Sequence, residues 1–162
     1  MLICTACSPE DPVNSDESIN EQPIREEQLQ VDTDAYDDTS EETVAAGMTL
    51  TINEEQVNVI WEENESVNAL MEMASQAPVV IDMSKYGGFE QVGELGSSLT
   101  RNDERIEAGP GDIMLYTGSS IVVFYGHNSW SYTRLGHIED KNSDELRELL
   151  GGKDVVITIA VH

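Results

Sequence analysis

The chain has 162 residues, enough for one domain of ordinary size, and it carries 32 Asp and Glu residues against 8 Lys and Arg. The formal net charge of −24 argues against a nucleic-acid partner, because phosphate groups need Lys and Arg to neutralise them. The same balance excludes a polybasic patch for a membrane surface.

The first segment, "MLICTACSPED", contains the two cysteines of the chain, Cys4 and Cys7. A thioredoxin-like C-x-x-C would open a helix in a βαβ unit, and a metal site would need more ligands than these two. The residues that follow fit neither context. Thr5 and Ala6 before Cys7, with Ser8 after it, instead resemble the lipobox of a bacterial lipoprotein signal.

This resemblance implies that residues 1–7 are the remnant of a signal and that the thiol of Cys7 carries a lipid, the chain's one link to a membrane. The protein is then expected outside the cytoplasm, anchored to the bacterial membrane as a lipoprotein. Cys4 stands where the signal usually has Leu, and only "MLI" lies upstream. We therefore expect Met1 to be a late start or the chain to be a fragment. With Met1 as the true start, the protein would be cytoplasmic.

Residues 8–47 form an acidic stretch with 13 Asp and Glu residues and a single basic residue, Arg25. The stretch has no sustained apolar period and contains Pro9, Pro12 and Pro23. Such a segment buries too little apolar surface to offset the entropy of ordering. We expect a disordered, self-repelling linker between the lipobox and the folded part.

From residue 48 to residue 162, short apolar runs alternate with turn signals, which predicts one folded domain. "MTLTINEEQVNVIWE", residues 48–62, alternates on both sides of "NEEQ" and predicts a hairpin of two half-buried strands. "NESVNALMEMASQ", residues 64–76, has apolar residues at helical spacing and predicts a helix with Asn64 as its N-cap.

The middle of the domain predicts further strands. "PVVIDM" is the first of them, and the Gly-rich "KYGGFEQVGELGSSL", residues 85–99, predicts short, strongly bent strands. "RNDERIEAGPGD", residues 101–112, predicts a surface connection. "DIMLYTGSSIVVFYG", residues 112–126, predicts a hairpin around Gly118-Ser119.

The C-terminal part predicts a strand, a helix and a strand. "SWSYTRLGHI" at residues 129–138 is the first strand, and "SDELRELL" at residues 143–150 is a short helix with Ser143 as its N-cap. "DVVITIAV" at residues 154–161 is nearly continuous in apolar residues and predicts a strand buried on both faces. About eight short strands without β-helix-β alternation favour a mainly β protein with a closed antiparallel barrel.

Several of these segments, taken in order, resemble the bacterial and archaeal cyclophilin-like domain family over about residues 49–161. The most specific parts are Pro110-Gly111-Asp112-Ile113, Phe124-Tyr125-Gly126 and Arg134-Leu135-Gly136-His137-Ile138. The resemblance implies a closed, eight-stranded cyclophilin-like barrel with one medium and one short helix over residues 48–162. It implies architecture much more than activity.

Enzymatic activity is left open by this resemblance. True cyclophilins are peptidyl-prolyl isomerases that use an Arg to hydrogen-bond the twisted peptide, beside a Phe, a Gln and an apolar pocket for proline. Here Arg101 and Arg105 lie in a polar connection without an adjacent Phe, and the Gln-Gly-Asp motif is missing because Pro110 precedes Gly111-Asp112. These two arginines are the candidate catalytic residues if the protein is an isomerase of unusual motif, which is the alternative function.

No cofactor or metal site is expected. His127, His137 and His162 show no ligand spacing with the acidic residues, and no calcium-loop pattern is present. Ser129 and Ser131 lie near His127, but the chain has no G-x-S-x-G nucleophile elbow.

The aromatic segment "FYGHNSWSYTRLGHI", residues 124–138, is the candidate binding site. In a strand, Trp130, Tyr132 and Arg134 share one face, and this face is too polar for a simple core. The alternative is that the two rings lean over the barrel mouth while Arg134 pairs with a carboxylate. The predicted ligand-binding residues are Tyr125, His127, Trp130, Tyr132 and Arg134, with Tyr86 and Phe89 opposite. We therefore expect a non-enzymatic module for a peptide, a protein or a small ligand.

Overall fold

The structure is a computed structural model, and it describes residues 47–162. The predicted signal remnant with Cys7 at residues 1–7, and the acidic linker as far as residue 46, lie outside the described residues. Among the helices of residues 47–162, none combines the length and the apolar character that a membrane span requires.

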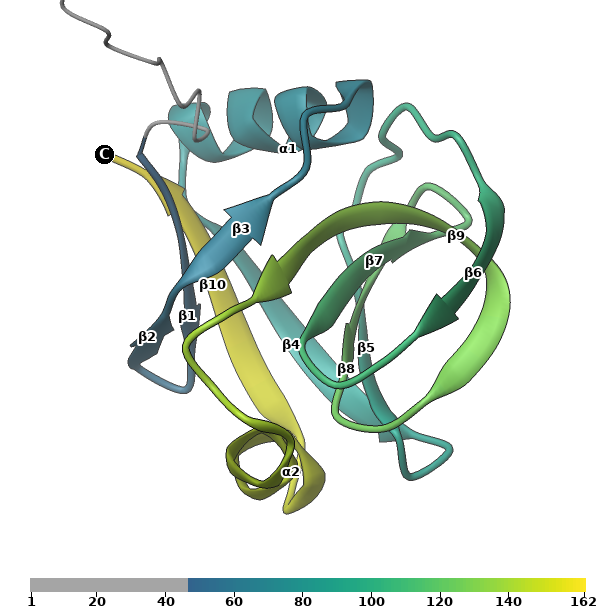
Figure 1. The fold of residues 1–162 in the computed structure, drawn as a ribbon. Helices are drawn as coiled ribbons and strands as arrows, with labels where there is room; N and C mark the ends of the chain where they lie inside the picture. The colour runs from purple at the N-terminus through teal and green to yellow at the C-terminus, as the bar shows by residue number, and fades with distance from the viewer. Residues whose placement is uncertain (1–46) are drawn as a thin grey trace, which may run out of the picture. The chain divides into compact units, whose positions relative to one another are not determined.

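The described part of the chain contains ten strands and two helices (Figure 1). They are β1 Met48–Ile52, β2 Glu55–Val57, β3 Val59–Trp61, α1 Glu65–Gln76, β4 Val79–Tyr86, β5 Glu90–Glu94, β6 Glu104–Ala108, β7 Asp112–Tyr116, β8 Ser120–Phe124, β9 Asn128–Ile138, α2 Ser143–Gly151 and β10 Val155–Val161. The predicted mainly β fold with an antiparallel barrel and two helices is therefore confirmed, with ten strands in place of eight.

The sheet runs in the order β2-β1-β10-β4-β5-β8-β7-β9-β3. Its two end strands, β2 and β3, are consecutive in the chain and are separated only by Asn58. The predicted second strand of the opening hairpin is thus broken in two, because β2 pairs with β1 while β3 pairs with β9. The Asn58 backbone holds this break, since its N–H donates to Asp140 and its carbonyl accepts from the Glu139 N–H. The continuous chain through Asn58 closes the barrel.

Strand β9 pairs with three other strands along its length. Its first half pairs with β6, with Tyr132 opposite Glu104, and its second half pairs with β7 and β3. The pairing with β7 shifts at Leu135, because Met114 faces Arg134 while Ile113 faces Gly136. This bulge bends the strand, and Figure 1 shows β9 curving away from the barrel toward β6.

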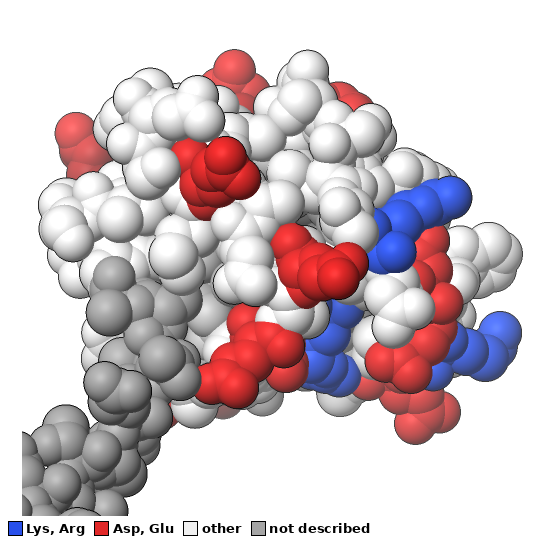
Figure 2. All heavy atoms as spheres, turned by 90° about the horizontal axis from the view of Figure 1, so that it is seen from above, with Lys and Arg blue, Asp and Glu red and all other residues white. Residues whose placement is uncertain are grey.

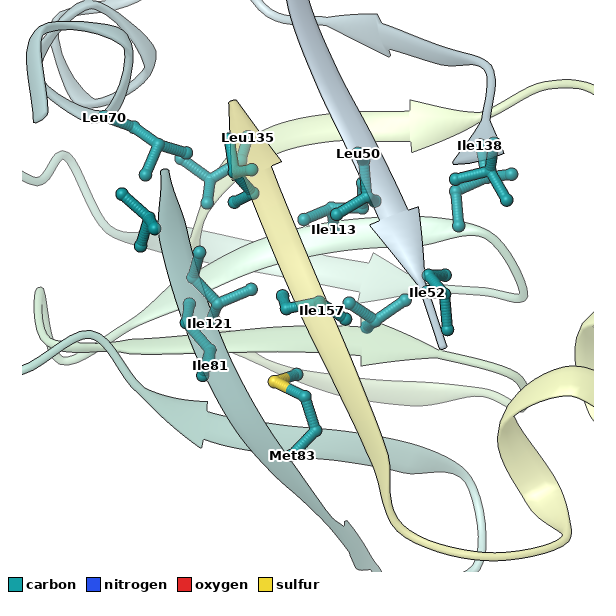
Figure 3. Packing of buried hydrophobic residues seen from close by; sticks show 14 of the residues in the cluster. Leu50, Ile52, Leu70, Ile81, Met83, Ile113, Ile121, Leu135, Ile138 and Ile157 are labelled. Atoms are coloured by element: carbon teal, nitrogen blue, oxygen red, sulfur yellow. The ribbon is translucent and has the colours of Figure 1, made fainter. Parts of the chain in front are cut away.

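The main core fills the barrel. Alternate residues of the strands point inward, such as Leu50 and Ile52 of β1 and Ile157 of β10, and meet side chains from β4, β7, β8 and β9 (Figure 3). Helix α1 lies across one end of the barrel and contributes Leu70, whereas α2 lies at the opposite end and contributes Leu146 (Figure 1). Burial of these apolar side chains is the main stabilising term of the domain.

A second, smaller core lies on the other face of β7 and β8. Its buried members are Ala108, Met114, Val122, Phe124 and Tyr132. Both faces of β7 and β8 are therefore covered, one by the barrel interior and the other by β6 and the first half of β9. The candidate site described below lies against this second core.

Four predictions of local structure were wrong. Residues 101–112 are not only a connection, since β6 lies within them and pairs with β9. The N-cap of α2 is Asn142 and not Ser143, because the Asn142 side chain accepts from the backbone of Asp144 and Glu145 and Glu145 completes a capping box. Strand β10 is buried on one face only, since Val156 is 40% exposed. Its neighbours β1 and β4 hydrogen-bond its two edges, and the residues that alternate with its buried ones, Val156, Thr158 and Ala160, are exposed or half-buried. The fourth is the unbroken second strand of the opening hairpin.

The surface keeps its cations close to carboxylates. On the face that Figure 2 shows, Asp and Glu side chains are spread widely, and the Lys and Arg side chains lie next to them. Among the described residues, four cations form ion pairs: Arg101 with Asp103, Arg134 with Asp112, Lys141 with Glu55 and Arg147 with Asp144. A nearby carboxylate therefore offsets the charge of four of the seven Lys and Arg side chains in residues 47–162.

Candidate ligand-binding cavity

A cavity of ≈ 460 Å³ lies against the second core. This volume falls within the range of roughly 300–1,000 Å³ that is usual for small-molecule sites. Strands β4, β5, β7, β8 and β9 each contribute to its wall. The lining residues are Tyr86, Glu90, Val92, Tyr116, Val122, Asn128, Trp130 and Tyr132.

The alternation of β5 explains which of its side chains reach the cavity. Glu90 and Val92 face the second core. Gln91 and Gly93, which alternate with them along the strand, face the barrel side. The amide of Gln91 is buried there and donates to the carbonyls of Leu150 and Lys153, at the C-terminal end of α2. This anchor fixes the register of β5 and with it the direction of Glu90.

Glu90 is the most unusual residue of the cavity. Its side chain is a carboxylic acid, yet the residue is only 5% exposed, and its Oε2 atom is buried without a hydrogen-bond partner. Burial raises the pKa of Glu90 to about 7, because removal from water disfavours the charged form. A buried oxygen without a partner costs free energy. Because Glu90 also lines the cavity, a small rotation about the terminal bond of its side chain can bring a carboxyl oxygen to a group that enters.

Tyr132 forms the inner aromatic wall and is held by three neighbours. Its ring meets those of Phe124 and Tyr116 edge-on, with centroid distances of 5.6 Å and 6.0 Å. Its phenolic oxygen accepts a hydrogen bond of 2.9 Å from the amide of Asn128. Burial raises the pKa of Tyr132, and the charge of Glu90 adds to this effect. The phenol is therefore neutral near pH 7 and can donate its own hydrogen.

Two aromatic side chains form the rim. Trp130 is 55% exposed and Tyr86 is 67% exposed, although both carry large apolar rings. Exposed aromatic rings beside a hollow are typical of ligand sites, because they can stack on a guest at little cost in conformational entropy. Val92 and Val122 supply the apolar floor.

Of the seven predicted ligand-binding residues, the structure brings three together, Tyr86, Trp130 and Tyr132. Phe89 packs against the second core next to this cavity, over Gly126. Tyr125 is buried in the main core and its outer edge lines another hollow beside α2.

The other two predicted residues, His127 and Arg134, do not line the cavity. His127 lines a neighbouring hollow with Asp112 and Gly109, and Asn128 belongs to the lining of both. Arg134 lies at the bulge of β9, and its guanidinium pairs with Asp112 at 2.9 Å and with Glu62 at 3.9 Å. This agrees with the alternative stated from the sequence, in which Arg134 pairs with a carboxylate.

Asp112 joins two of the three most specific sequence motifs, residues 110–113 and residues 134–138. Its Oδ1 contacts Nη1 of Arg134 and Nδ1 of His137, each at 2.9 Å, and its Oδ2 accepts from the Gly109 N–H. Asp112 itself is buried. These contacts connect the start of β7 with the end of β9. We therefore assign the cluster of Asp112, Arg134 and His137 a structural role, which is to hold β7 to β9.

The two candidate isomerase arginines also lie outside the cavity lining. Arg101 is exposed and pairs with Asp103 at 3.0 Å. Arg105 lies in β6 opposite Ser131, with its side chain exposed. Neither arginine is positioned to donate to a guest between Glu90 and Trp130.

The sequence analysis missed Glu90, Tyr116 and Asn128. The strongest signal for Glu90 was its place in "FEQV", where a carboxylate lies within a predicted strand between apolar residues. In a chain with 32 acidic residues, that signal does not stand out.

No group of three His, Cys, Asp or Glu side chains within residues 47–162 is arranged to hold a metal ion.

Comparison with known proteins gives one match. A model of the cyclophilin-like family matches residues 50–160, a span that includes all the residues lining the cavity. The search of curated proteins and the search of solved structures each found no match.

Proposed function

Because this chain belongs to the cyclophilin-like family over residues 50–160, we propose that its domain is a non-enzymatic binding module for a peptide, a protein segment or a small ligand. The guest occupies the cavity between β5 and the first half of β9. The observation that carries this proposal is the combination of a hollow of ≈ 460 Å³, exposed aromatic rings at its rim and the buried Glu90 in its lining, which has a carboxyl oxygen without a partner. A largely apolar pocket with a few convergent polar groups is the usual form of a ligand site.

The test is a fragment screen on the full chain by ligand-observed NMR, with neutral and charged compounds. We expect hits whose signal change is lost in Trp130→Ala. Ile60→Ala is the matched control, because Ile60 is also an exposed apolar side chain but lies on β3, away from the cavity. Hits that persist in Trp130→Ala, or a screen without hits, would contradict the proposal.

Binding without catalysis is the function that the site supports best. Prolyl isomerisation needs a donor near the prolyl nitrogen to stabilise the twisted amide, and Arg101 and Arg105 point elsewhere. We therefore expect the full chain to leave the rate of a protease-coupled proline isomerisation assay at its background value. Acceleration of the isomerisation that is lost in Arg101→Ala or Arg105→Ala would favour the alternative function, a prolyl isomerase, over the non-enzymatic binding module.

The proposal includes an envelope location with a lipid on Cys7. Its support is the sequence alone, in which Thr5 and Ala6 precede Cys7 and an acidic stretch follows. Metabolic labelling of the native product with a palmitate analogue should mark the wild type and Cys4→Ala but not Cys7→Ala. Label that survives Cys7→Ala, or no label on the wild type, would refute the lipid anchor.

A further inference from the structure

The chemistry of the cavity narrows the class of guest, and this step rests on the proposed function. Among the eight lining residues, Glu90 is the one acid, and none is Lys, Arg or His. The other titratable groups in the lining are the phenols of Tyr86, Tyr116 and Tyr132. Tyr125, behind Glu90, has its pKa raised by burial and by the Glu90 charge, so it too stays neutral near pH 7. The described residues around Glu90 thus provide no cation for its carboxylate.

The walls of the cavity suit a positive charge as well as an apolar chain. Four of the eight lining residues are aromatic: Tyr86, Tyr116, Trp130 and Tyr132. The face of an aromatic ring attracts a cation through its quadrupole, and Trp is the best partner among the side chains. A guest with a positive head and an apolar stem can place its head at Glu90 and its stem against Val92 and Val122.

The carboxylate of Glu90 distinguishes between kinds of cation. A quaternary ammonium group has no N–H and could not hydrogen-bond the Glu90 carboxylate, which lines the cavity. A primary ammonium group has three donors and can bond this carboxylate, and a charge-assisted bond of this kind is roughly twice as strong as a neutral one. The net charge of −24 favours the approach of a cation over that of an anion.

We propose that the cavity binds a primary alkylammonium group, with Glu90 as its counter-ion and the rings of Trp130, Tyr86 and Tyr132 around its charged head and the adjoining stem. The group is the side chain of a lysine in a peptide or protein, or a free aliphatic amine. The hydroxyl of Tyr132, held by Asn128, supplies a further polar contact for the guest.

This binding is linked to pH. Glu90 must be ionised to pair with an ammonium group, and its pKa of about 7 leaves it mostly protonated at about pH 6. An alkylammonium group stays charged at about pH 6 and at about pH 8, since the pKa of a lysine amine is about 10.4. The affinity is reduced by the fraction of protein in the competent state, so it should rise roughly tenfold between about pH 6 and pH 8.

The experiment is calorimetric titration of the full chain with three probes: Nα-acetyl-lysine methylamide, n-pentylamine, and the neutral Nα,Nε-diacetyl-lysine methylamide. At pH 8 we expect the charged lysine probe to bind at least about tenfold more tightly than its neutral analogue. Binding of n-pentylamine with similar affinity indicates that the ammonium stem suffices, and much weaker binding indicates that a peptide backbone is also held. Both of these outcomes support the proposal.

Variants separate the inference from the proposed function. Glu90→Gln keeps the shape of the side chain and should lose about tenfold in affinity for the charged probe together with the pH dependence. Glu94→Gln removes the same charge from the same strand, outside the cavity lining, and should bind as the wild type does. Circular dichroism checks that each variant is folded.

If the neutral analogue binds as tightly as the charged lysine probe, and this binding is lost in Trp130→Ala, the ammonium assignment is overturned and the binding function stays intact. No binding of any probe, with no hit in the fragment screen, would overturn both.

Discussion

The side-chain amide of Asn128 donates a hydrogen bond of 2.9 Å to the phenolic oxygen of Tyr132, four residues along β9. The amide oxygen of Asn128 also accepts from the backbone N–H of Ser129. Asn128 thus fixes both the start of the strand and the orientation of the inner wall of the cavity.

Asn128→Ala should lower the free energy of unfolding by about 1–2 kcal/mol, because two hydrogen bonds of a partly buried amide are lost. It should also raise the pKa of Tyr132 further above its usual value, since the Asn128 hydrogen bond is the one contribution that lowers it. Urea unfolding measures the stability, and NMR of ¹³C-labelled tyrosine measures the pKa. The double variant with Tyr132→Phe is the control: if the two losses simply add, the contact between these side chains does not contribute as described.

Glu90→Gln should change how stability depends on pH. The folded-state pKa of about 7 exceeds the ordinary value of 4.5, so between these values the folded protein holds more protons than the unfolded chain. Stability contributed by protonated Glu90 is therefore fully present below about pH 4.5 and is lost as the pH rises to about 7. The full shift corresponds to roughly 3 kcal/mol.

The measurement is thermal and urea unfolding of wild type and Glu90→Gln across this pH range. The difference between the two proteins should move in favour of Glu90→Gln as the pH rises, so that the variant is the more stable protein at about pH 8. Glu94→Gln should follow the wild type, because Glu94 is an exposed residue and the amide oxygen of Gln can still accept the hydrogen bond from Oγ of Ser120. A constant difference between wild type and Glu90→Gln would mean that Glu90 titrates as an ordinary surface acid.

Much of the fold was predictable because its signals are local. The helix that begins after Asn64 and the hairpin around Gly118-Ser119 were predicted from capping, periodicity and turn residues, and the structure confirms both. The family assigned from the motifs at residues 110–113, 124–126 and 134–138 is confirmed as well. By contrast, β6 reads as a polar connection, because its alternation of charged and apolar residues covers five positions only.

The site was harder to predict because it depends on long-range register. Trp130 and Tyr132 were chosen for their chemistry, and Tyr86 joins them because the last residue of β4 and the first half of β9 line the same cavity. In a regular strand, Arg134 would lie on the same face as Trp130 and Tyr132. In the structure, β9 has a bulge at Leu135, and the Arg134 side chain pairs with Asp112. No sequence pattern locates such a bulge, and none separates Glu90 from the other acidic residues.

Asp112→Ala should lower the free energy of unfolding by about 2–4 kcal/mol, because it leaves Arg134, His137 and the Gly109 N–H without their shared acceptor. Asp82→Ala, at an exposed position of β4, should stay within about 0.5 kcal/mol of the wild type. Chemical denaturation of both variants tests the structural part assigned to the cluster. If Asp112→Ala is as stable as Asp82→Ala, the cluster does not hold β7 to β9.

Gly93→Ala should destabilise the barrel by about 1–3 kcal/mol through overpacking. A methyl group at Gly93 would press on Cγ2 of Ile81 and lie 2.5 Å from Sδ of Met83 and 2.8 Å from the carbonyl oxygen of Asp82. Gly152→Ala is the matched control, since its nearest neighbour would be 3.8 Å away. The melting temperature of each variant gives the comparison, and an unchanged value for Gly93→Ala would place β5 farther from β4 than described.

The central claim is that guests bind in the cavity between β5 and the first half of β9, and ¹H–¹⁵N NMR of the full chain with Nα-acetyl-lysine methylamide tests it most directly. The chain has two tryptophans, so the indole signals of Trp130 at the cavity rim and Trp61, whose indole N–H donates to the Met48 carbonyl, can be compared in one spectrum. We predict that the Trp130 indole and the amides of Glu90, Asn128 and Tyr132 shift on titration while the Trp61 indole does not. Shifts confined to the hollow beside α2, around Lys85 and Arg147, or no shifts at all would contradict the claim.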